Sequence, residues 1–158
     1  MSRIYDVIER FIQQQDWSYD RLDDHQALRF GLSTENASFQ CYVQVDEERE
    51  QCCVYSCMPN NAEEEKRSAV AEFVARANYG MRIGNFEIDM EDGEVRFKVS
   101  IDVEGSELTE VMVRNMIACS ITCSDRYYPG LMQVLYGNAS PKAAVQQVET
   151  MASIPDEM

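Results

Sequence analysis

The sequence predicts an α+β fold with a mainly antiparallel five-stranded sheet, in the element order α-β-β-β-α-β-β-α-α. Two observations lead to this prediction. Several segments alternate apolar and polar residues at strand spacing, and they follow one another without an intervening helix. Other segments, at the start, middle and end of the chain, repeat apolar residues at helical spacing. Because strands and helices are grouped rather than strictly alternating, we expect antiparallel pairing.

The first part of the chain predicts one helix and one strand. Apolar residues at helical spacing indicate an amphipathic helix over about residues 3–14. Trp17 and Tyr19 follow in what we interpret as a short extended connection. Residues 26–32 then alternate as a strand, and residues 33–36 form a turn cluster.

Two further strands follow on either side of a charged loop. Residues 39–45 alternate cleanly between apolar and polar side chains, as a half-buried strand does. Residues 46–50 form the loop. Residues 52–58 are apolar at nearly every position, so we expect this third strand to be covered on both faces. Pro59 ends it.

The second helix is predicted to begin at Asn61, whose side chain can cap it. Glu63, Glu64 and Glu65 suit the positive N-terminal end of a helix. The expected buried stripe consists of Val70, Phe73, Val74 and Ala77. Gly80 ends the helix where a left-handed residue is favoured.

Residues 85–100 predict a hairpin with a tight turn centred on Asp92-Gly93, a pair favoured in type I′ turns. That turn implies an apolar face that pairs Met90 with Val95, Ile88 with Phe97, and Phe86 with Val99. The opposite face would pair Asp89 with Arg96, Glu87 with Lys98, and Asn85 with Ser100. We therefore interpret this acidic stretch as a turn between two strands.

The same stretch does not fit a calcium loop. An EF-hand loop needs glycine at its sixth position and glutamate at its twelfth. Counted from Asp89, Gly93 is the fifth residue and Ser100 is the twelfth. The spacing thus excludes this type of calcium site.

The last third of the chain predicts helices. A long helical pattern begins at residue 106, and the Pro-Gly pair at residues 129–130 is expected to kink or break it. Residues 131–136 would add one or two turns. The Ser-Pro pair at residues 140–141 then begins a final helix that ends near residue 149.

Length and charge limit the possible classes of protein. The chain has 158 residues, which suits one domain over residues 1–150 with a loose acidic tail over residues 151–158. The formal net charge is −14, and Lys and Arg are scattered singly among carboxylates. Such a surface repels nucleic-acid phosphates and anionic membranes. We therefore expect no nucleic acid and no membrane as partner.

The N-terminal segment, residues 1–15, is interrupted by charged side chains and lacks the apolar core of a signal peptide. No stretch approaches the roughly 18 consecutive apolar residues that a membrane span needs. We expect a cytoplasmic protein, in which the six cysteines remain free thiols.

The cysteines raise the possibility of a zinc site, which needs four converging ligands. Adjacent Cys52 and Cys53 point to opposite faces of a strand, and Cys53 and Cys57 lie about 13 Å apart at strand rise. Cys119 and Cys123 stack one helical turn apart and could coordinate together. We interpret the cysteines as buried thiols that pack as small hydrophobes. A redox pair at Cys119 and Cys123 is the alternative.

No other motif assigns a catalytic, cofactor-binding or metal-ligating residue. His25 lies in a polar turn after two aspartates, and no nucleophile motif accompanies it, so we expect it to be solvated. Tyr127, Tyr128 and Tyr136 flank the Pro-Gly pair and are interpreted as core residues, or alternatively as an exposed anchor for a partner. The Gly-x3-Gly sequence of residues 80–84 lacks the Lys-Ser/Thr of a phosphate loop.

The element order and the segment ANYGMRIGNFEIDMEDGEVRFKVSIDVEG resemble the YbjN family of bacterial sensory transduction regulators. The specific likeness lies in Asn78-Tyr79-Gly80, Gly84-x-Phe86-Glu87 and Asp92-Gly93. It spans about residues 3–149. The family resembles the type III secretion chaperone fold, in which a homodimer presents a surface to another polypeptide. The resemblance implies this fold and supplies no catalytic residue; partner-binding residues stay unassigned.

The sequence thus predicts a non-enzymatic cytosolic regulator or chaperone-like adaptor that acts through protein–protein binding, with no cofactor and no specific small molecule. The alternative is an acidic protein that binds divalent cations such as calcium. A third hypothesis, an enzyme of unrecognised type, would need a concave pocket with strongly shifted ionisable groups.

We also expect a homodimer, because the resemblance points to dimeric chaperones and two-fold dimers are the commonest oligomers. The contact should be mostly apolar, because the net charge opposes association. The helix of Val70, Phe73 and Val74, or the helix from Val111 to Ile121, would supply it.

Overall fold

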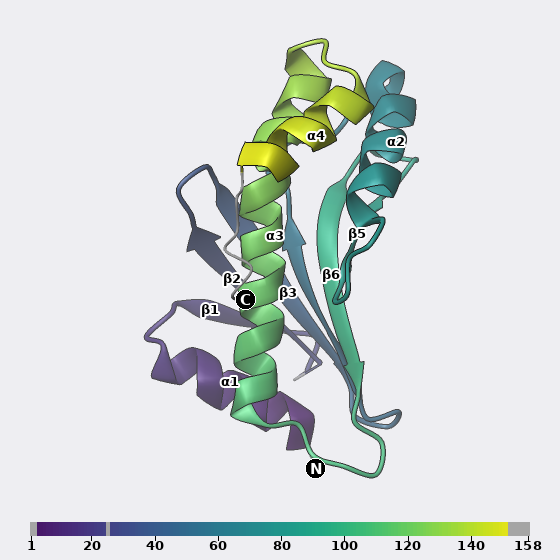
Figure 1. The fold of residues 1–158 in the computed structure, drawn as a ribbon. Helices are drawn as coiled ribbons and strands as arrows, with labels where there is room; N and C mark the ends of the chain where they lie inside the picture. The colour runs from purple at the N-terminus through teal and green to yellow at the C-terminus, as the bar shows by residue number, and fades with distance from the viewer. Residues whose placement is uncertain (1–2, 25, 152–158) are drawn as a thin grey trace.

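A computed structural model describes residues 3–24 and 26–151. Its elements are α1 (Arg3–Gln14), β1 (Tyr19–Leu22), β2 (Ala27–Ser33), β3 (Ser38–Asp46), β4 (Gln51–Cys57), the 3-10 turn η1 (Glu64–Lys66), α2 (Arg67–Asn78), β5 (Asn85–Ile88), β6 (Val95–Asp102), α3 (Glu110–Tyr136) and α4 (Pro141–Met151). The strands form one antiparallel six-stranded sheet in the order β1-β2-β3-β4-β6-β5. The helices gather over one face, with α3 across the sheet, α1 near one end and α2 and α4 near the other (Figure 1).

The α+β class and the antiparallel pairing are confirmed, but the sheet has one strand more than the five expected. The additional strand is β1, in the segment that the sequence suggested was only a connection. Tyr19 lies opposite Phe30, and Leu22 lies opposite Ala27. Because β1 is a short edge strand with no fully buried position, it shows no apolar alternation.

Strand β3 shows how the sheet divides its side chains. One set is buried under the helices: Phe39, Cys41, Val43 and Val45. The alternate set points to the opposite face, where Gln40 and Gln44 are exposed and Tyr42 is half-buried. The predicted half-buried strand is therefore confirmed, because successive side chains point to opposite faces.

Strand β4 does not have the covering on both faces that its apolar sequence predicts. Val54 and Ser56 are buried on the helix side, whereas Cys53 and Cys57 are half-buried on the other side. Tyr55 also points away from the helices and is nevertheless buried, because the Arg96 guanidinium lies 4.1 Å from the centre of its ring. A neighbouring side chain, not a second layer of structure, supplies this covering.

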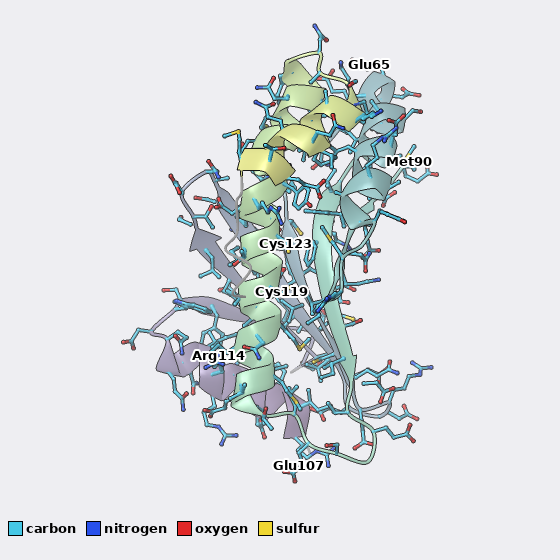
Figure 2. All side chains as sticks on the ribbon, viewed as in Figure 1. Glu65, Met90, Glu107, Arg114, Cys119 and Cys123 are labelled. Carbon is cyan, nitrogen blue, oxygen red and sulfur yellow. The ribbon has the colours of Figure 1, made fainter. Side chains whose placement is uncertain are left out.

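The predicted hairpin of β5 and β6 exists, but its register was wrong by two residues. Ile88 pairs with Val95, and Phe86 pairs with Phe97. A shift of two keeps the side chains of the paired residues on their predicted faces, so the apolar side of the strands still faces the core. The connection is a six-residue loop over residues 89–94 rather than a two-residue turn, and Met90 in this loop points outward (Figure 2).

The wider loop follows from hydrogen bonds that a tight turn could not make. Carboxylate oxygens of Asp89 and Asp92 accept bonds from backbone N–H groups two residues ahead, at 2.8 and 2.9 Å. The Gly93 carbonyl accepts a 2.8 Å bond from the Ala62 N–H. Arg67 donates to the carbonyls of Met90 and Glu91. The loop is therefore fixed to the segment that leads into α2.

The start of the second helix also differs from the prediction. Asn61 does not cap it; its side-chain amide donates to the Asp92 carbonyl at 3.4 Å. A 3-10 turn precedes α2, and Glu63 occupies its N-cap position without a side-chain bond. The predicted stripe of Val70, Phe73, Val74 and Ala77 is confirmed as buried.

Helix α3 begins later than predicted and is not interrupted. Thr109 caps it, accepting from the Met112 N–H at 3.2 Å. The helix continues through Pro129 to Tyr136. Proline has no N–H, so the Asp125 carbonyl one turn earlier lacks its helical donor. That carbonyl instead accepts from the Asn36 side chain at 3.3 Å, which satisfies the acceptor that the proline leaves without a donor.

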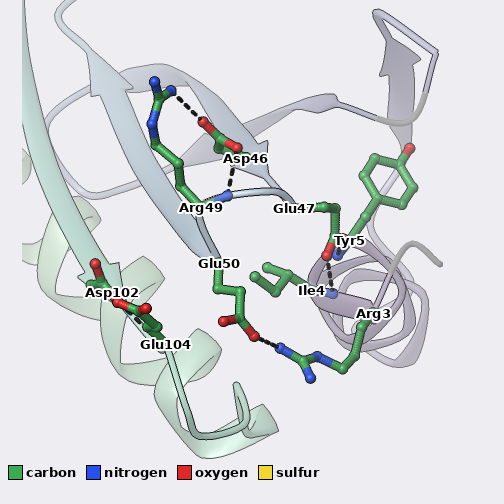
Figure 3. A network of polar contacts seen from close by, with 9 residues as sticks. All are labelled: Arg3, Ile4, Tyr5, Asp46, Glu47, Arg49, Glu50, Asp102 and Glu104. Atoms are coloured by element: carbon green, nitrogen blue, oxygen red, sulfur yellow. Dashed lines mark hydrogen bonds and ion pairs between the residues drawn. The ribbon is translucent and has the colours of Figure 1, made fainter.

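The N-terminal helix α1 is confirmed at its predicted bounds, and a distant loop caps it (Figure 3). The Glu47 carboxylate, between β3 and β4, accepts bonds from the N–H groups of Ile4 and Tyr5 at 3.2 and 2.8 Å. Arg3 forms an ion pair with Glu50 of the same loop. Negative charge at a helix N-terminus is stabilising, so this loop holds α1 on the sheet. The predicted final helix is confirmed too, with Ser140 accepting from the Ala143 N–H.

Candidate functional site

The face of the sheet on which none of the described helices lies, which we call the open face, is the most distinctive surface of the fold. Its centre is a row of aromatic, amide and sulfur side chains from β3 and β4: Gln40, Tyr42, Gln44, Cys53, Tyr55 and Cys57. A hollow of about 480 Å³ lies on it, with Tyr42, Tyr55, Met58, Pro59 and Arg96 among its lining residues. Shallow hollows of this size suit a few side chains of a partner.

The cations of the open face are matched by carboxylates. Arg29 Nη2 lies 2.8 Å from Asp20, and Lys98 Nζ lies 3.3 Å from Glu87. Arg96 lies 3.6 Å from the same Glu87 carboxylate. These ion pairs are partly exposed and contribute little to stability. Their main effect is on the electrostatic potential of the surface. They leave the open face nearly neutral, whereas the whole chain has a formal charge of −14.

Two side chains of this face, Tyr55 and Cys57, stay protonated near neutral pH. Burial raises the pKa of Tyr55 to about 12, and the nearby Arg96 charge only partly opposes this. Burial also raises the pKa of the Cys57 thiol to about 11. A neutral phenol and a neutral thiol are weak nucleophiles. The arrangement therefore offers packing and hydrogen bonding rather than an activated nucleophile.

The sequence did not assign the residues that bind a partner. One pattern in it nevertheless indicates the open face. Gln40, Tyr42 and Gln44 alternate with apolar residues on β3, as expected for side chains that point away from the core. The corresponding signal on β4 was hidden, because Cys53, Tyr55 and Cys57 are themselves apolar enough to suggest a buried position.

The structure separates the six cysteines, all of which are free. Cys41 and Cys52 are buried on the helix side, and burial raises the pKa of each to about 12. Cys53 and Cys57 occupy the open face. Among residues 3–24 and 26–151, no group of three or more His, Cys, Asp and Glu side chains is placed to hold a metal ion.

Cys119 and Cys123 are the cysteines that the fold brings together. They lie half-buried on successive turns of α3 (Figure 2). A hydrogen bond from the Cys123 thiol lowers the pKa of Cys119 to about 7, and the same bond raises the pKa of Cys123. The sequence interpretation as inert hydrophobes fits Cys41 and Cys52 better than it fits this pair.

The other candidates from the sequence divide between core and surface. Tyr127 is buried against Phe73 and Phe86, and its hydroxyl donates to Glu149 at 2.8 Å. Tyr128 packs edge-on against Phe39. The core interpretation therefore holds for these two, whereas Tyr136 is largely exposed. His25 lies outside the described residues.

The acidic loop over residues 89–94 uses one oxygen each of Asp89 and Asp92 to accept backbone hydrogen bonds within the loop. Its two aspartates therefore act as turn-forming side chains.

In the described part of the chain, no helix is long and apolar enough to cross a membrane.

Three solved structures share this fold. The crystal structure of YbjN from E. coli, a putative transcription regulator by its own description, has a TM-score of 0.61 at 12% identity and covers 87% of this chain and 93% of that one. A chain of the ExsC–ExsE complex has a TM-score of 0.55 at 13% identity, covering 80% and 91%. A chain of the HopA1–SchA chaperone–effector complex has a TM-score of 0.50 at 17% identity, covering 77% and 91%.

The similarities to these structures concern the fold, because the identities are low. No curated protein sequence matches the chain significantly. The family assignment rests on the sequence itself: residues 5–133, which include every strand of the sheet and most of α3, match the family described as "YbjN: Putative bacterial sensory transduction regulator". With this match and the shared fold, the chain belongs to the YbjN family.

Proposed function

We propose that this chain is a non-enzymatic cytoplasmic regulator or chaperone-like adaptor, and that its open face binds another polypeptide. The observation that carries the proposal is the sheet itself, which has helices on one face and a nearly neutral, tyrosine-lined hollow on the other. The family description and the chaperone–effector complex among the similar folds support the same class of function.

The chemistry of the open face suits a polypeptide partner. Tyrosine and arginine are enriched at protein interfaces, because each combines a large contact area with hydrogen-bonding capacity. Tyr42, Tyr55 and Arg96 supply these groups around the hollow. Gln40 and Gln44 are exposed beside them, and their amides can pair with a partner's backbone. We expect the partner to insert an apolar or aromatic side chain into the hollow.

The test is capture of partners from the native cytosol with matched variants. Tyr42→Ala combined with Gln40→Ala removes contact area from the open face without touching the buried core. Tyr136→Ala is the control, since this tyrosine is exposed outside the open face. We expect the control to retain the proteins that the parent captures and the open-face variant to lose them. If the open-face variant captures the same proteins as the parent, the proposal is wrong.

We further propose that the protein is a homodimer whose contact lies outside the open face. The stripe of Val70, Phe73 and Val74 is buried within its own chain, so it is not available for such a contact. On the helix from Val111 to Ile121, Val113 and Ile117 are also buried, while Val111 is exposed. The dimer contact therefore has to use other exposed apolar residues, of which Tyr79 and Ile83 are examples.

Light scattering tests the dimer. We expect a mass of about two chains, with little change between low and high salt, because apolar contacts are not screened. A monomeric mass at micromolar concentration would contradict the proposed dimer. It would also weaken the proposal of a chaperone-like adaptor.

A further inference from the structure

One face of α3 carries a continuous row of sulfur atoms that the proposed function does not use. Met112, Met116, Cys119 and Cys123 are spaced by four, three and four residues. At this spacing the side chains of a helix lie on one face. Cys119 and Cys123 occupy adjacent turns near the middle of the helix (Figure 2). The row therefore ends in two thiols that are neighbours in space.

The two thiols have a defined environment. They are close enough to share a hydrogen bond. The Cys119 thiol also lies 3.6 Å from the carbonyl oxygen of Ile83, in the connection between α2 and β5. Arg126 follows Cys123 within one turn of the helix. Both cysteines are half-buried, so the site is partly desolvated and still open to a small ion.

Buried hydrogen bonds fix the rotation of α3 that presents these thiols. Ser56 of β4 donates to the Ser120 carbonyl at 3.1 Å, and its hydroxyl also bonds to the hydroxyls of Ser120 and Ser124. All three serines are buried. Because Ser120 and Ser124 each directly follow one of the cysteines, holding the serines against the sheet also fixes the cysteines on the flank of the helix, where both are half-buried. The pair is thus pre-positioned by the fold.

We propose that Cys119 and Cys123 form a two-thiol binding site for a soft, thiophilic d10 cation, with Cu(I) as the ion that best fits. Thiolates select soft cations, and Cu(I) accepts as few as two sulfur ligands. Zinc needs four ligands, and no third His, Cys, Asp or Glu joins the pair among the described residues.

Binding of the cation exchanges protons for the metal ion. Metal binding requires thiolates and releases protons. The cation therefore displaces the protons of the two thiols, whose sulfur atoms lie one helical turn apart. The formal charge of −14 also attracts cations to the protein.

The chain contains a matched control. Cys53 and Cys57 have the same four-residue spacing in the sequence, but they lie on strand β4. At strand rise the two are about 13 Å apart, too far for one ion to bridge. If a spacing of four residues in the sequence were sufficient, both cysteine pairs would bind the cation.

The experiment is an anaerobic titration of the reduced protein with Cu(I) in competition with a chromophoric chelator. It compares the parent with the variant Cys119→Ser/Cys123→Ser and the variant Cys53→Ser/Cys57→Ser. We expect about one Cu(I) per chain for the parent and for the strand variant. The helix variant should bind Cu(I) at least about 100-fold more weakly, because both ligands are lost. Circular dichroism checks that each variant is folded, and X-ray absorption of the loaded parent should show sulfur neighbours only.

Absence of tight Cu(I) binding by the parent would overturn the inference. So would equal binding by the parent and the helix variant, or loss of binding in the strand variant alone. If the variant Cys119→Ser/Cys123→Ser does not fold, the single variants Cys119→Ala and Cys123→Ala are tested instead. Each must then weaken Cu(I) binding by at least about tenfold. Stoichiometric zinc that disappears when either cysteine is replaced would also contradict the two-ligand site.

Discussion

The two faces of one sheet differ in how they exclude water. On the helix side, Val43 and Phe97 are completely buried by packing against other elements. On the open face, Tyr55 is nearly as buried, yet only the Arg96 side chain and its neighbours cover it. The first kind of burial is continuous and apolar, whereas the second is formed by side chains that can move. A small exposed area therefore identifies a core residue only where helices or strands pack over the side chain.

The largest expected difference between the faces is at adjacent residues of β6. Phe97→Ala removes a fully buried ring whose centre lies 4.9 Å from that of Phe86, and should cost about 3–5 kcal/mol in the free energy of unfolding. Lys98→Ala on the open face removes a partly exposed ion pair with Glu87 and should cost less than about 1 kcal/mol. Urea unfolding of both variants measures this. Similar costs would mean that the open face is as tightly packed as the covered one.

An intermediate effect is expected at the loop that joins β5 to β6, at the end of the sheet. Gly93 has a φ of +79°, and a side chain there would overlap the carbonyl of Ala62. We expect Gly93→Val to cost about 2–3 kcal/mol, from a strained backbone and the lost fit to Ala62. Thermal and urea unfolding measure the loss.

Gly80→Val is the control, because Gly80 also has a positive φ, +86°, but no atom lies within 4 Å of the added carbon. It should cost about 1–2 kcal/mol, from backbone strain alone. Equal costs would show that the contact with Ala62 contributes nothing. Calcium should not raise the melting temperature of the parent; a rise that Gly93→Val abolishes would instead assign a calcium-binding role to this loop.

The smallest expected effect concerns the helix that covers the sheet. Asn36→Ala removes the donor that reaches the Asp125 carbonyl and should cost about 0.5–1.5 kcal/mol. In a Pro129→Ala background, the new N–H of residue 129 can bond to the same carbonyl. We therefore expect Asn36→Ala to cost about half as much there, measured by a double-mutant cycle. Strict additivity would show that Asn36 does not compensate for the proline.

The sequence predicted those features that depend on local pattern. The Ser-Pro pair at residues 140–141 gave the start of α4. The alternation on β3 and the helical spacing of α1 gave the correct elements because burial on one side repeats with the period of each structure. The faces of the β5–β6 hairpin were correct for the same reason. Its register was wrong because Asp89 and Asp92 form their own side-chain turns, which lengthen the loop.

The features that escaped prediction depend on distant contacts. Pro129 should interrupt a helix by local rules, yet α3 continues through it, and Asn36 supplies the missing donor from another part of the chain. Strand β1 shows no apolar alternation in the sequence, and its place in the sheet depends on its pairing with β2. The open face was missed on β4 because the polar group that covers Tyr55 belongs to β6.

The cap that Glu47 provides to α1 has a consequence for synthesis of the chain. The N–H of Tyr5 finds its acceptor 42 residues later, in the loop between β3 and β4. When α1 leaves the ribosome, its capping carboxylate has not yet emerged. A helix of 12 residues is only marginally stable in water without tertiary support. The first element to be made is therefore secured only after the loop between β3 and β4 is available, and a nascent chain that stops before residue 47 carries an N-terminal helix without its cap.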